Sequence, residues 1–144
     1  MSANKSHFFE DLEIGMSASL QKQIGEAEVQ TFADLTGDTN PVHLDEEFAK
    51  GTMFKTRIAH GMLSASLIST LLGTQLPGTG VIYLAQDLRF RAPVKLGDVV
   101  VATVTVTELN ERRKRATLAC KCMVGETIVI DGSATVMVPS RSNA

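Results

Sequence analysis

A carboxylate and an imidazole stand five residues apart in the run Thr36-Gly37-Asp38-Thr39-Asn40-Pro41-Val42-His43. Proline fixes its own φ, lacks an N–H and pushes the preceding Asn40 toward extended geometry, so no regular helix is expected to run through this octet. Asp38 and His43 are therefore expected on a shaped loop. Their reference pKa values, about 3.9 and about 6.5, allow such a pair to move protons near neutral pH.

The same octet also has an ordinary interpretation as a turn. Gly37 can close a helix, and the side chain of Asp38 or Asn40 can bond to nearby backbone without any catalytic role. A turn of this kind does not require His43, which favours the chemical interpretation. Both interpretations stay open on these residues alone.

Composition limits the classes of function. The chain has 144 residues, 44% hydrophobic and 21% charged, as expected for one compact domain spanning residues 1–144. Fourteen basic and 16 acidic residues leave a net charge of -2, and aromatic residues make up 5%, so binding of nucleic acid or an anionic membrane is not expected. The first twenty residues hold charges and no long apolar stretch, which predicts a cytoplasmic protein without signal peptide or membrane span.

Cys120 and Cys122 are the only cysteines. A one-residue gap places both on the same face of a strand, whereas most zinc and redox pairs have a gap of two residues. Without further ligands or a secretory signal, we expect two small buried thiols in place of a metal site or a disulfide.

Two helical segments frame the octet. Apolar residues recur at helical spacing over 26–36, acidic residues lie near its start, and Gly37 is suited to end it. After His43, Asp45 can cap a single turn over 46–49 that Gly51 closes. The segment 61–73 carries no charge and is apolar all around, which predicts a buried helix; at about 20 Å it is too short for a bilayer core of about 30 Å.

The rest of the chain is predicted to form a β-sheet. Residues 81–92, 98–109, 115–124 and 127–138 are rich in Val, Ile and Thr with alternating polarity, and a further strand is expected near 17–22. The charged run 110–114 suits a solvated hairpin tip better than a ligand contact. We therefore predict an α+β domain in which an antiparallel sheet wraps around a long buried central helix, with a frayed tail after Pro139.

Taken together, these features resemble the MaoC-like (R)-specific enoyl-CoA hydratases, which have the hot-dog fold. The family signature is Gly-Asp-x-Asn-Pro-aliphatic-His with an aromatic residue upstream and a small residue downstream; it is matched by Phe32, Gly37, Asp38, Asn40, Pro41, Val42, His43 and Ala49. The likeness continues through His60-Gly61-Met62 and Phe90-Arg91-Ala92-Pro93-Val94, so it covers nearly the whole chain.

The resemblance implies reversible syn addition of water to a trans-2-enoyl-CoA, giving the (R)-3-hydroxyacyl-CoA without a metal or redox cofactor. By analogy, His43 is the general base and Asp38 holds the water and supplies a proton to the α-carbon. The backbone N–H of Gly61 is the implied oxyanion donor, and a helix N-terminus independently suits negative charge, although Gly61 could simply start the helix. Asn40 orients the loop or the water, or makes a local turn bond only.

The remaining implied site residues have structural alternatives. Ser69 matches a serine near the catalytic pair, but a serine within a helix often bonds a carbonyl of the preceding turn. Leu72 and Val136 match positions that line the acyl pocket and could equally be core. Arg89 and Arg91 are candidates for the phosphates of coenzyme A, or simply solvated.

His60 precedes the implied oxyanion glycine. Nothing in the sequence pairs it with an acid, so we expect packing before catalysis for this histidine. The family also implies a homodimer in which one sheet continues into the next.

Three other activities stay open. A dehydratase acting on acyl carrier protein would use the same groups and differ in carrier. A hot-dog thioesterase would release free thiol and would not need the Asp38–His43 pair. A non-catalytic acyl-CoA-binding module would keep the fold without turnover. The pathway, whether polyester supply, fatty-acid degradation or a specialised acid route, is left open by the sequence.

Overall fold

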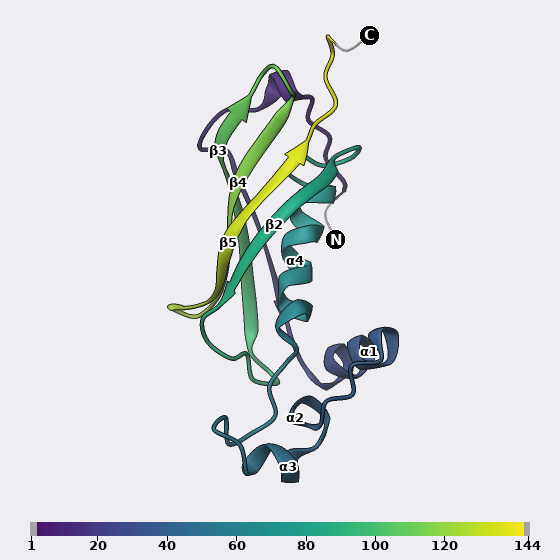
Figure 1. The fold of residues 1–144 in the computed structure, drawn as a ribbon, viewed down its shortest axis with the longest axis vertical. Helices are drawn as coiled ribbons and strands as arrows, with labels where there is room; N and C mark the ends of the chain where they lie inside the picture. The colour runs from purple at the N-terminus through teal and green to yellow at the C-terminus, as the bar shows by residue number, and fades with distance from the viewer. Residues whose placement is uncertain (1–2, 143–144) are drawn as a thin grey trace.

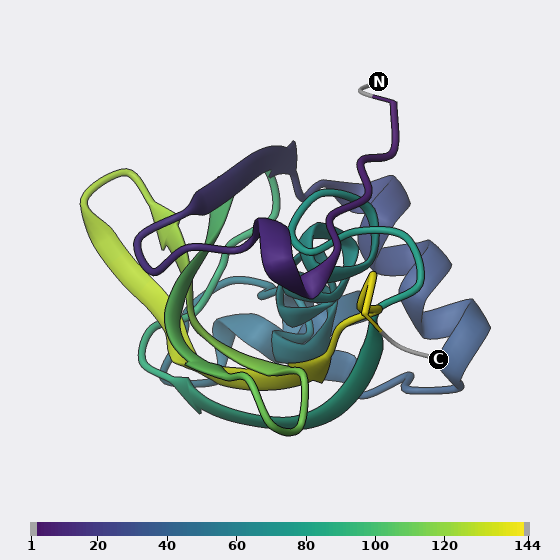
Figure 2. The same cartoon turned by 90° about the horizontal axis from the view of Figure 1, so that it is seen from above.

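A five-stranded antiparallel sheet curls along one long helix in the computed structural model, which describes residues 3–142. Figure 1 shows the sheet on one side of the helix, and Figure 2 shows its curvature from above. The elements are η1 (Phe9–Asp11), β1 (Ser17–Gln23), α1 (Glu26–Thr36), α2 (Pro41–Leu44), α3 (Glu46–Lys50), α4 (Gly61–Thr74), β2 (Ile82–Phe90), β3 (Val99–Asn110), β4 (Arg115–Val124) and β5 (Thr127–Met137). This is the predicted α+β hot-dog architecture.

The sheet has the strand order β1-β3-β4-β5-β2, with every neighbouring pair antiparallel. Side-chain alternation determines which face is buried: Ala102, Val104 and Val106 on β3 are buried against the helix. On the opposite face, hydroxyl groups pair across β1 and β3, including Ser19 with Thr103 at 3.0 Å. All five predicted strands are confirmed, and the short η1 turn had no counterpart in the sequence prediction.

The long helix α4 is buried on one side only. Ile68, Leu71 and Leu72 face the sheet and are at most 1% exposed, whereas Ser66 and Ser69 on the other side are exposed. The prediction of a helix buried all around is therefore wrong for the single chain, because the sheet covers only one face of α4. Within residues 3–142, no helix has both the length and the apolar character needed to cross a membrane.

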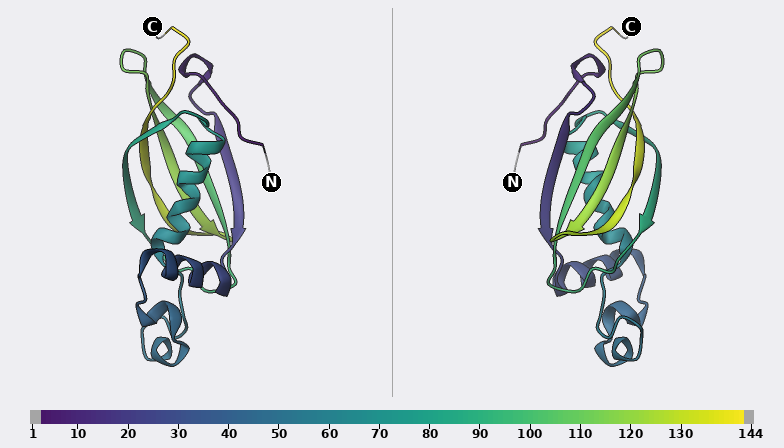
Figure 3. Two further views of the ribbon diagram at one scale, coloured as in Figure 1. Left: turned by 90° about the vertical axis from the view of Figure 1, so that its right-hand side faces the viewer. Right: turned by 90° about the vertical axis from the view of Figure 1, so that its left-hand side faces the viewer.

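The catalytic candidates lie in a segment at one end of the sheet. In Figures 1 and 3, α1, α2 and α3 lie beyond the end of the sheet where α4 begins. Helix α1 has the predicted bounds and ends at Gly37, whose φ of 81° is the left-handed conformation that glycine adopts easily. The expectation that His43 lies on a shaped loop needs a correction, because Pro41 occupies the first position of the one-turn helix α2, where its missing N–H costs nothing.

Outside this segment, the cysteines and the C-terminal residues have defined environments. Cys120 and Cys122 are buried free thiols, as predicted, and burial raises their pKa values to about 11 and about 12. Ser140 and Arg141 bond to Glu10, and Arg141 also pairs with Asp11, so residues 140–142 are tied to η1. The prediction of a frayed tail is therefore wrong for Ser140 and Arg141, and its part on residues 143–144 lies outside the described residues.

Close packing between β2 and β5 leads to a first prediction. Gly132 pairs with Leu88, and a Cβ at Gly132 would overlap the backbone oxygen of Asp87. Because a backbone atom cannot move aside without parting the strands, Gly132→Ala should lower the free energy of unfolding by about 1–3 kcal/mol in urea denaturation. The control is Gly73→Ala in α4, where a Cβ meets nothing within 4 Å and the change should not exceed about 1 kcal/mol. Equal unfolding midpoints for wild type and Gly132→Ala would contradict this packing.

Candidate active site

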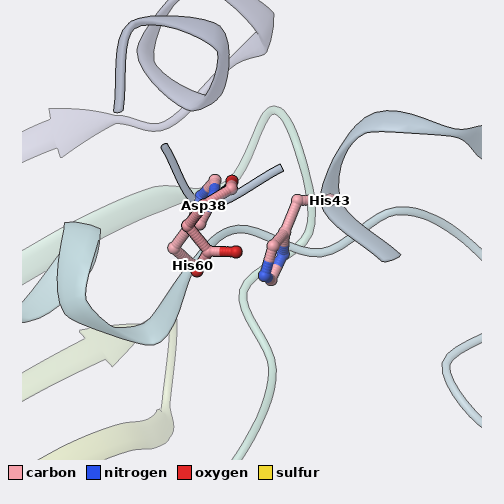
Figure 4. A group of neighbouring side chains, drawn as sticks. All are labelled: Asp38, His43 and His60. Atoms are coloured by element: carbon pink, nitrogen blue, oxygen red, sulfur yellow. The ribbon is translucent and has the colours of Figure 1, made fainter. Parts of the chain in front are cut away.

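Three titratable side chains converge at the start of α4. Asp38 lies on the loop after α1, His43 on α2, and His60 at the N-cap of α4. A side-chain oxygen or ring nitrogen of each lies within 4.8 Å of those of the other two. Figure 4 shows the carboxylate of Asp38 directed toward the ring of His43, with His60 beside both. The tertiary structure therefore brings together the pair that the sequence places five residues apart.

His43 is held so that one ring nitrogen remains free to accept a proton. His43 is 9% exposed as a residue, and its Nδ1 lies 2.8 Å from the backbone oxygen of Ile58. A carbonyl oxygen only accepts, so Nδ1–H is the donor and Nε2 carries the lone pair of the neutral ring. Burial lowers the pKa of His43, and the neighbouring His60 acts in the same direction, whereas the bond to Ile58 and the charge of Asp38 raise it. The net lowering favours the neutral, basic form at neutral pH.

Local hydrogen bonds shape the loop that carries Asp38. The N–H of Asn40 donates to Oδ1 of Asp38 at 3.3 Å, and Oδ1 of Asn40 accepts from the N–H of Val42 at 3.2 Å. The second bond makes Asn40 the N-cap of α2. The turn interpretation and the chemical interpretation of the octet are thus compatible, because the same bonds that build the turn present Asp38 and His43.

His60 contacts both members of the pair. Its Nε2 lies 3.0 Å from the backbone oxygen of Asp38, its ring stacks on that of His43 at 3.9 Å between centroids, and Phe32 packs at 4.7 Å. At 2% exposure His60 is packed, as expected, but its position inside the site went unpredicted. The available signal was its place at the cap of the uncharged helix, next to Gly61.

The hydrogen bonds of this cluster limit the nitrogens that a metal ion could use. Nδ1 of His43 and Nε2 of His60 each lie against a carbonyl oxygen. Each ring therefore keeps at most one nitrogen for a ligand, and Asp38 adds the carboxylate of the cluster. That the site works without a metal ion stays a prediction.

A cavity of about 520 Å³ opens beside the cluster. His43, Gly61 and Ser64 contribute to its wall, and the rest is mainly apolar: Met53, Phe54, Ile58, Met62, Phe90 and Pro93. Gly61 starts α4, so its N–H has no intrahelical partner and lies at the positive end of the helix dipole. A Cβ at Gly61 would come within 2.7 Å of the Phe90 ring, so glycine allows close approach here. The site combines an apolar chamber with a few polar groups at one end.

The other candidates lie at different distances from this cavity. Arg91 lines it and pairs with Asp131 at 2.7 Å, whereas exposed Arg89 is paired with Asp87 at 3.5 Å. Ser69 lines a separate cavity of about 530 Å³ between α4 and β2. Leu72 and Val136 belong to the buried core. Their roles in substrate binding stay predictions.

Ser64 and Arg57 are parts of the site that the sequence interpretation missed. The Ser64 hydroxyl is buried without a partner among the described residues, and it lines the cavity one helical turn after Gly61. Arg57 donates from Nε to the backbone oxygen of His43 at 2.7 Å and makes a two-pronged ion pair with Glu26 at 2.6 and 2.9 Å. These bonds join α1, α2 and the segment before α4. No sequence spacing could signal them, because Glu26 and Arg57 are 31 residues apart.

Comparison with known proteins identifies the family. The model of the MaoC-like domain matches residues 10–127. The chain belongs to the MaoC-like domain family. An (R)-specific enoyl-CoA hydratase of Rhodospirillum rubrum is 56% identical over 135 residues, covering 94% of both chains. A 3-hydroxybutyryl-CoA dehydratase of Methylorubrum extorquens is 53% identical over 137 residues, covering 95% of this chain and 87% of that protein.

A solved structure also resembles this MaoC-like domain. The (R)-hydratase of Aeromonas caviae, described as involved in PHA biosynthesis, is 50% identical and superposes with a TM-score of 0.88. The superposition covers 90% of this chain and 99% of that structure. The hot-dog architecture and the family resemblance inferred from the signature are both confirmed.

The Arg57 network yields a second prediction. Arg57→Met removes both the ion pair to Glu26 and the bond to the His43 carbonyl, so the helix that carries His43 loses its anchor. Turnover in the hydratase assay below should fall on the order of tenfold, because small displacements of catalytic groups are costly. Arg113→Met, at the exposed hairpin tip, should retain the wild-type rate. An Arg57→Met protein as active as wild type would show that the anchor is dispensable.

Proposed function

We propose that this protein is an (R)-specific enoyl-CoA hydratase, a hydro-lyase that adds water reversibly and syn to short- and medium-chain trans-2-enoyl-CoA. The product is the (R)-3-hydroxyacyl-CoA. The observation that carries the proposal is the convergence of Asp38 and His43 beside the N-terminus of α4, in a chain whose relatives are named for this chemistry.

The proposed reaction begins with His43. Nε2 of the neutral ring takes a proton from a water that Asp38 helps to hold, and the water oxygen bonds to the β-carbon. The electron pair of the double bond moves through the α-carbon to the thioester oxygen. The proton on Nε2 passes to the Asp38 carboxylate, which delivers it to the α-carbon as the electron pair returns from the thioester oxygen. One water is added in total, and both side chains recover their starting charge. Because both groups act from one face, addition is syn, and positioned proton transfer typically contributes 10²- to 10⁴-fold.

Negative charge on the thioester oxygen needs a donor. In the proposal, the backbone N–H of Gly61 binds this oxygen, with the dipole of the 14-residue helix α4 behind it. A single oxyanion donor is typically worth about 10²- to 10³-fold in rate. Asn40 acts indirectly, by capping α2 and holding the loop.

We propose that the acyl chain and the coenzyme A part of the substrate bind to different parts of the site. The acyl part occupies the apolar chamber. Leu72 and Val136 are assigned to the acyl side by family analogy alone, because both lie in the buried core behind it. Ser69 is assigned near the catalytic pair, also by analogy, and lines the separate cavity between α4 and β2. Arg91 at the cavity wall is the better candidate for a coenzyme A phosphate, because Arg89 lies outside the cavity. The proposed chemistry uses no metal and no redox cofactor, since acid–base groups and one oxyanion donor complete it.

We further propose a homodimer formed along β2. This strand is at the edge of the sheet, and its Ile82, Tyr83 and Leu84 are exposed apolar side chains. The half-covered face of α4 lies next to it, with Met62 exposed and a cavity of about 530 Å³ between the two elements. A second copy pairing along β2 would extend the sheet and cover this apolar surface.

The activity is tested with crotonyl-CoA. Wild-type protein should remove the conjugated-thioester absorbance, and Asp38→Asn and His43→Ala should each lower the rate on the order of 10²- to 10⁴-fold. Equal rates for wild type and both variants would contradict the hydratase proposal. Release of free thiol would indicate a thioesterase, faster turnover of crotonyl-acyl carrier protein would indicate a dehydratase of that carrier, and binding without turnover would indicate a binding module.

The dimer is tested by light scattering coupled to gel filtration. The wild-type mass should be about twice the 15.5 kDa of one chain. Leu84→Lys places a charge on the β2 surface and should shift the mass toward one chain. Ile14→Lys, equally a change of an exposed apolar residue but before β1, should leave the mass unchanged. A wild-type mass of one chain would refute the dimer.

A further inference from the structure

We infer that His60 is a positioning residue for the proposed reaction, holding the Asp38 loop by a hydrogen bond and fixing the ring of His43 by stacking. The effect on catalysis rests on the proposed function. The contacts themselves rest only on the geometry of Asp38, His43 and His60. It assigns a function to a histidine that the sequence pattern alone assigns to packing.

The hydrogen bond to Asp38 determines the tautomer of His60. Nε2 lies 3.0 Å from the backbone oxygen of Asp38, so Nε2–H must be the donor. Nδ1 is buried and has no partner among the described residues. A packing residue gains nothing from a buried, unpaired nitrogen, which carries a desolvation cost. The bond instead ties the backbone of the Asp38 loop to the first turn of α4, where the implied oxyanion donor Gly61 lies.

The stack restrains His43 from a second direction. Ile58 holds the edge of the His43 ring, and His60 covers its face at 3.9 Å between centroids. Phe32 in turn packs on His60, with 4.7 Å between the ring centroids. With edge and face both contacted, the ring of His43 cannot rotate freely, and its Nε2 remains the proton acceptor.

Stacking also bears on the charge of His43. The charged or titratable groups around it are Asp38, His60, Arg57 at its backbone oxygen and Arg91 on the same cavity wall. Burial is the largest cause that lowers the pKa of His43, and His60 lowers it further, against the opposing effect of Asp38. Two stacked imidazoles resist carrying a charge together. His60 thereby helps to keep His43 neutral and available as a base at neutral pH.

Two variants separate the contacts. His60→Phe retains an aromatic ring for the stack and loses the donor to Asp38, whereas His60→Gln retains a side-chain N–H and loses the ring. Both remove the second imidazole. The control is His7→Gln, because His7 is the third histidine of the chain and bonds the Pro77 carbonyl away from the cluster. With three histidines, the ring C–H signals can be assigned from these variants by NMR.

The first readout needs no substrate. The NMR titration midpoint of His43 should move to higher pH in both His60→Phe and His60→Gln, and should not move in His7→Gln. The pH below which hydratase activity falls should move upward in the same variants. The NMR titration needs no turnover. If the protein proved inactive as a hydratase, the shift of the His43 midpoint could still be measured, so failure of the proposed function and failure of this inference give different results.

The second readout is the division between kcat and KM. His60→Phe should lower kcat about tenfold or more with KM within about threefold, because the donor positions Asp38 without contacting substrate. His60→Gln should recover part of that loss. If both variants keep the wild-type kcat and the wild-type His43 midpoint, with only thermal stability reduced, His60 is a packing residue and the inference is overturned. If His60→Phe does not fold, the same outcomes in His60→Gln decide.

Discussion

The hydrogen bond between Nδ1 of His43 and the carbonyl of Ile58 is the constraint on which the site depends. It commits one nitrogen of a buried imidazole as a donor and leaves the other as an acceptor. The bond exists only because the segment before α4 runs back past α2, and Arg57, the residue before Ile58, ties the same segment to the backbone oxygen of His43. Without the contact between this segment and α2, Asp38 and His43 would still be neighbours in sequence. The imidazole of His43, however, would have neither a fixed ring orientation nor a fixed tautomer.

The fold provides the second requirement, a mainly apolar chamber beside a helix N-terminus. The sheet covers one face of α4 and leaves the first turn of the helix open toward the cavity. The backbone amide of Gly61 then lies beside apolar side chains, where electrostatic interactions are stronger than in bulk water. The same one-sided coverage leaves apolar surface along α4 and β2. Site and proposed dimer interface thus arise from a single feature, a sheet too narrow to surround its helix.

Much of this arrangement was predictable from local patterns. Alternation of Val, Ile and Thr identified the strands within one or two residues, and Gly37 marked the end of α1 because few other residues accept its φ. Less was predictable where distant segments meet. The one-sided burial of α4 depends on how far the sheet curls, and the contacts of His60 and Arg57 join residues 14 to 31 positions apart. Periodicity carries no information about such pairs.

The sequence by itself determined the strands, the helices α1, α3 and α4, the Asp38–His43 pair and the family, because each is encoded in residue types at short spacing. Tertiary structure alone decided that His60 stacks on His43, that Ser64 faces the cavity while Ser69 faces another, and that Arg91 reaches the site while Arg89 does not. The physical reason is that these outcomes depend on how the ends of separate elements meet. That meeting is set by packing of the whole sheet against α4.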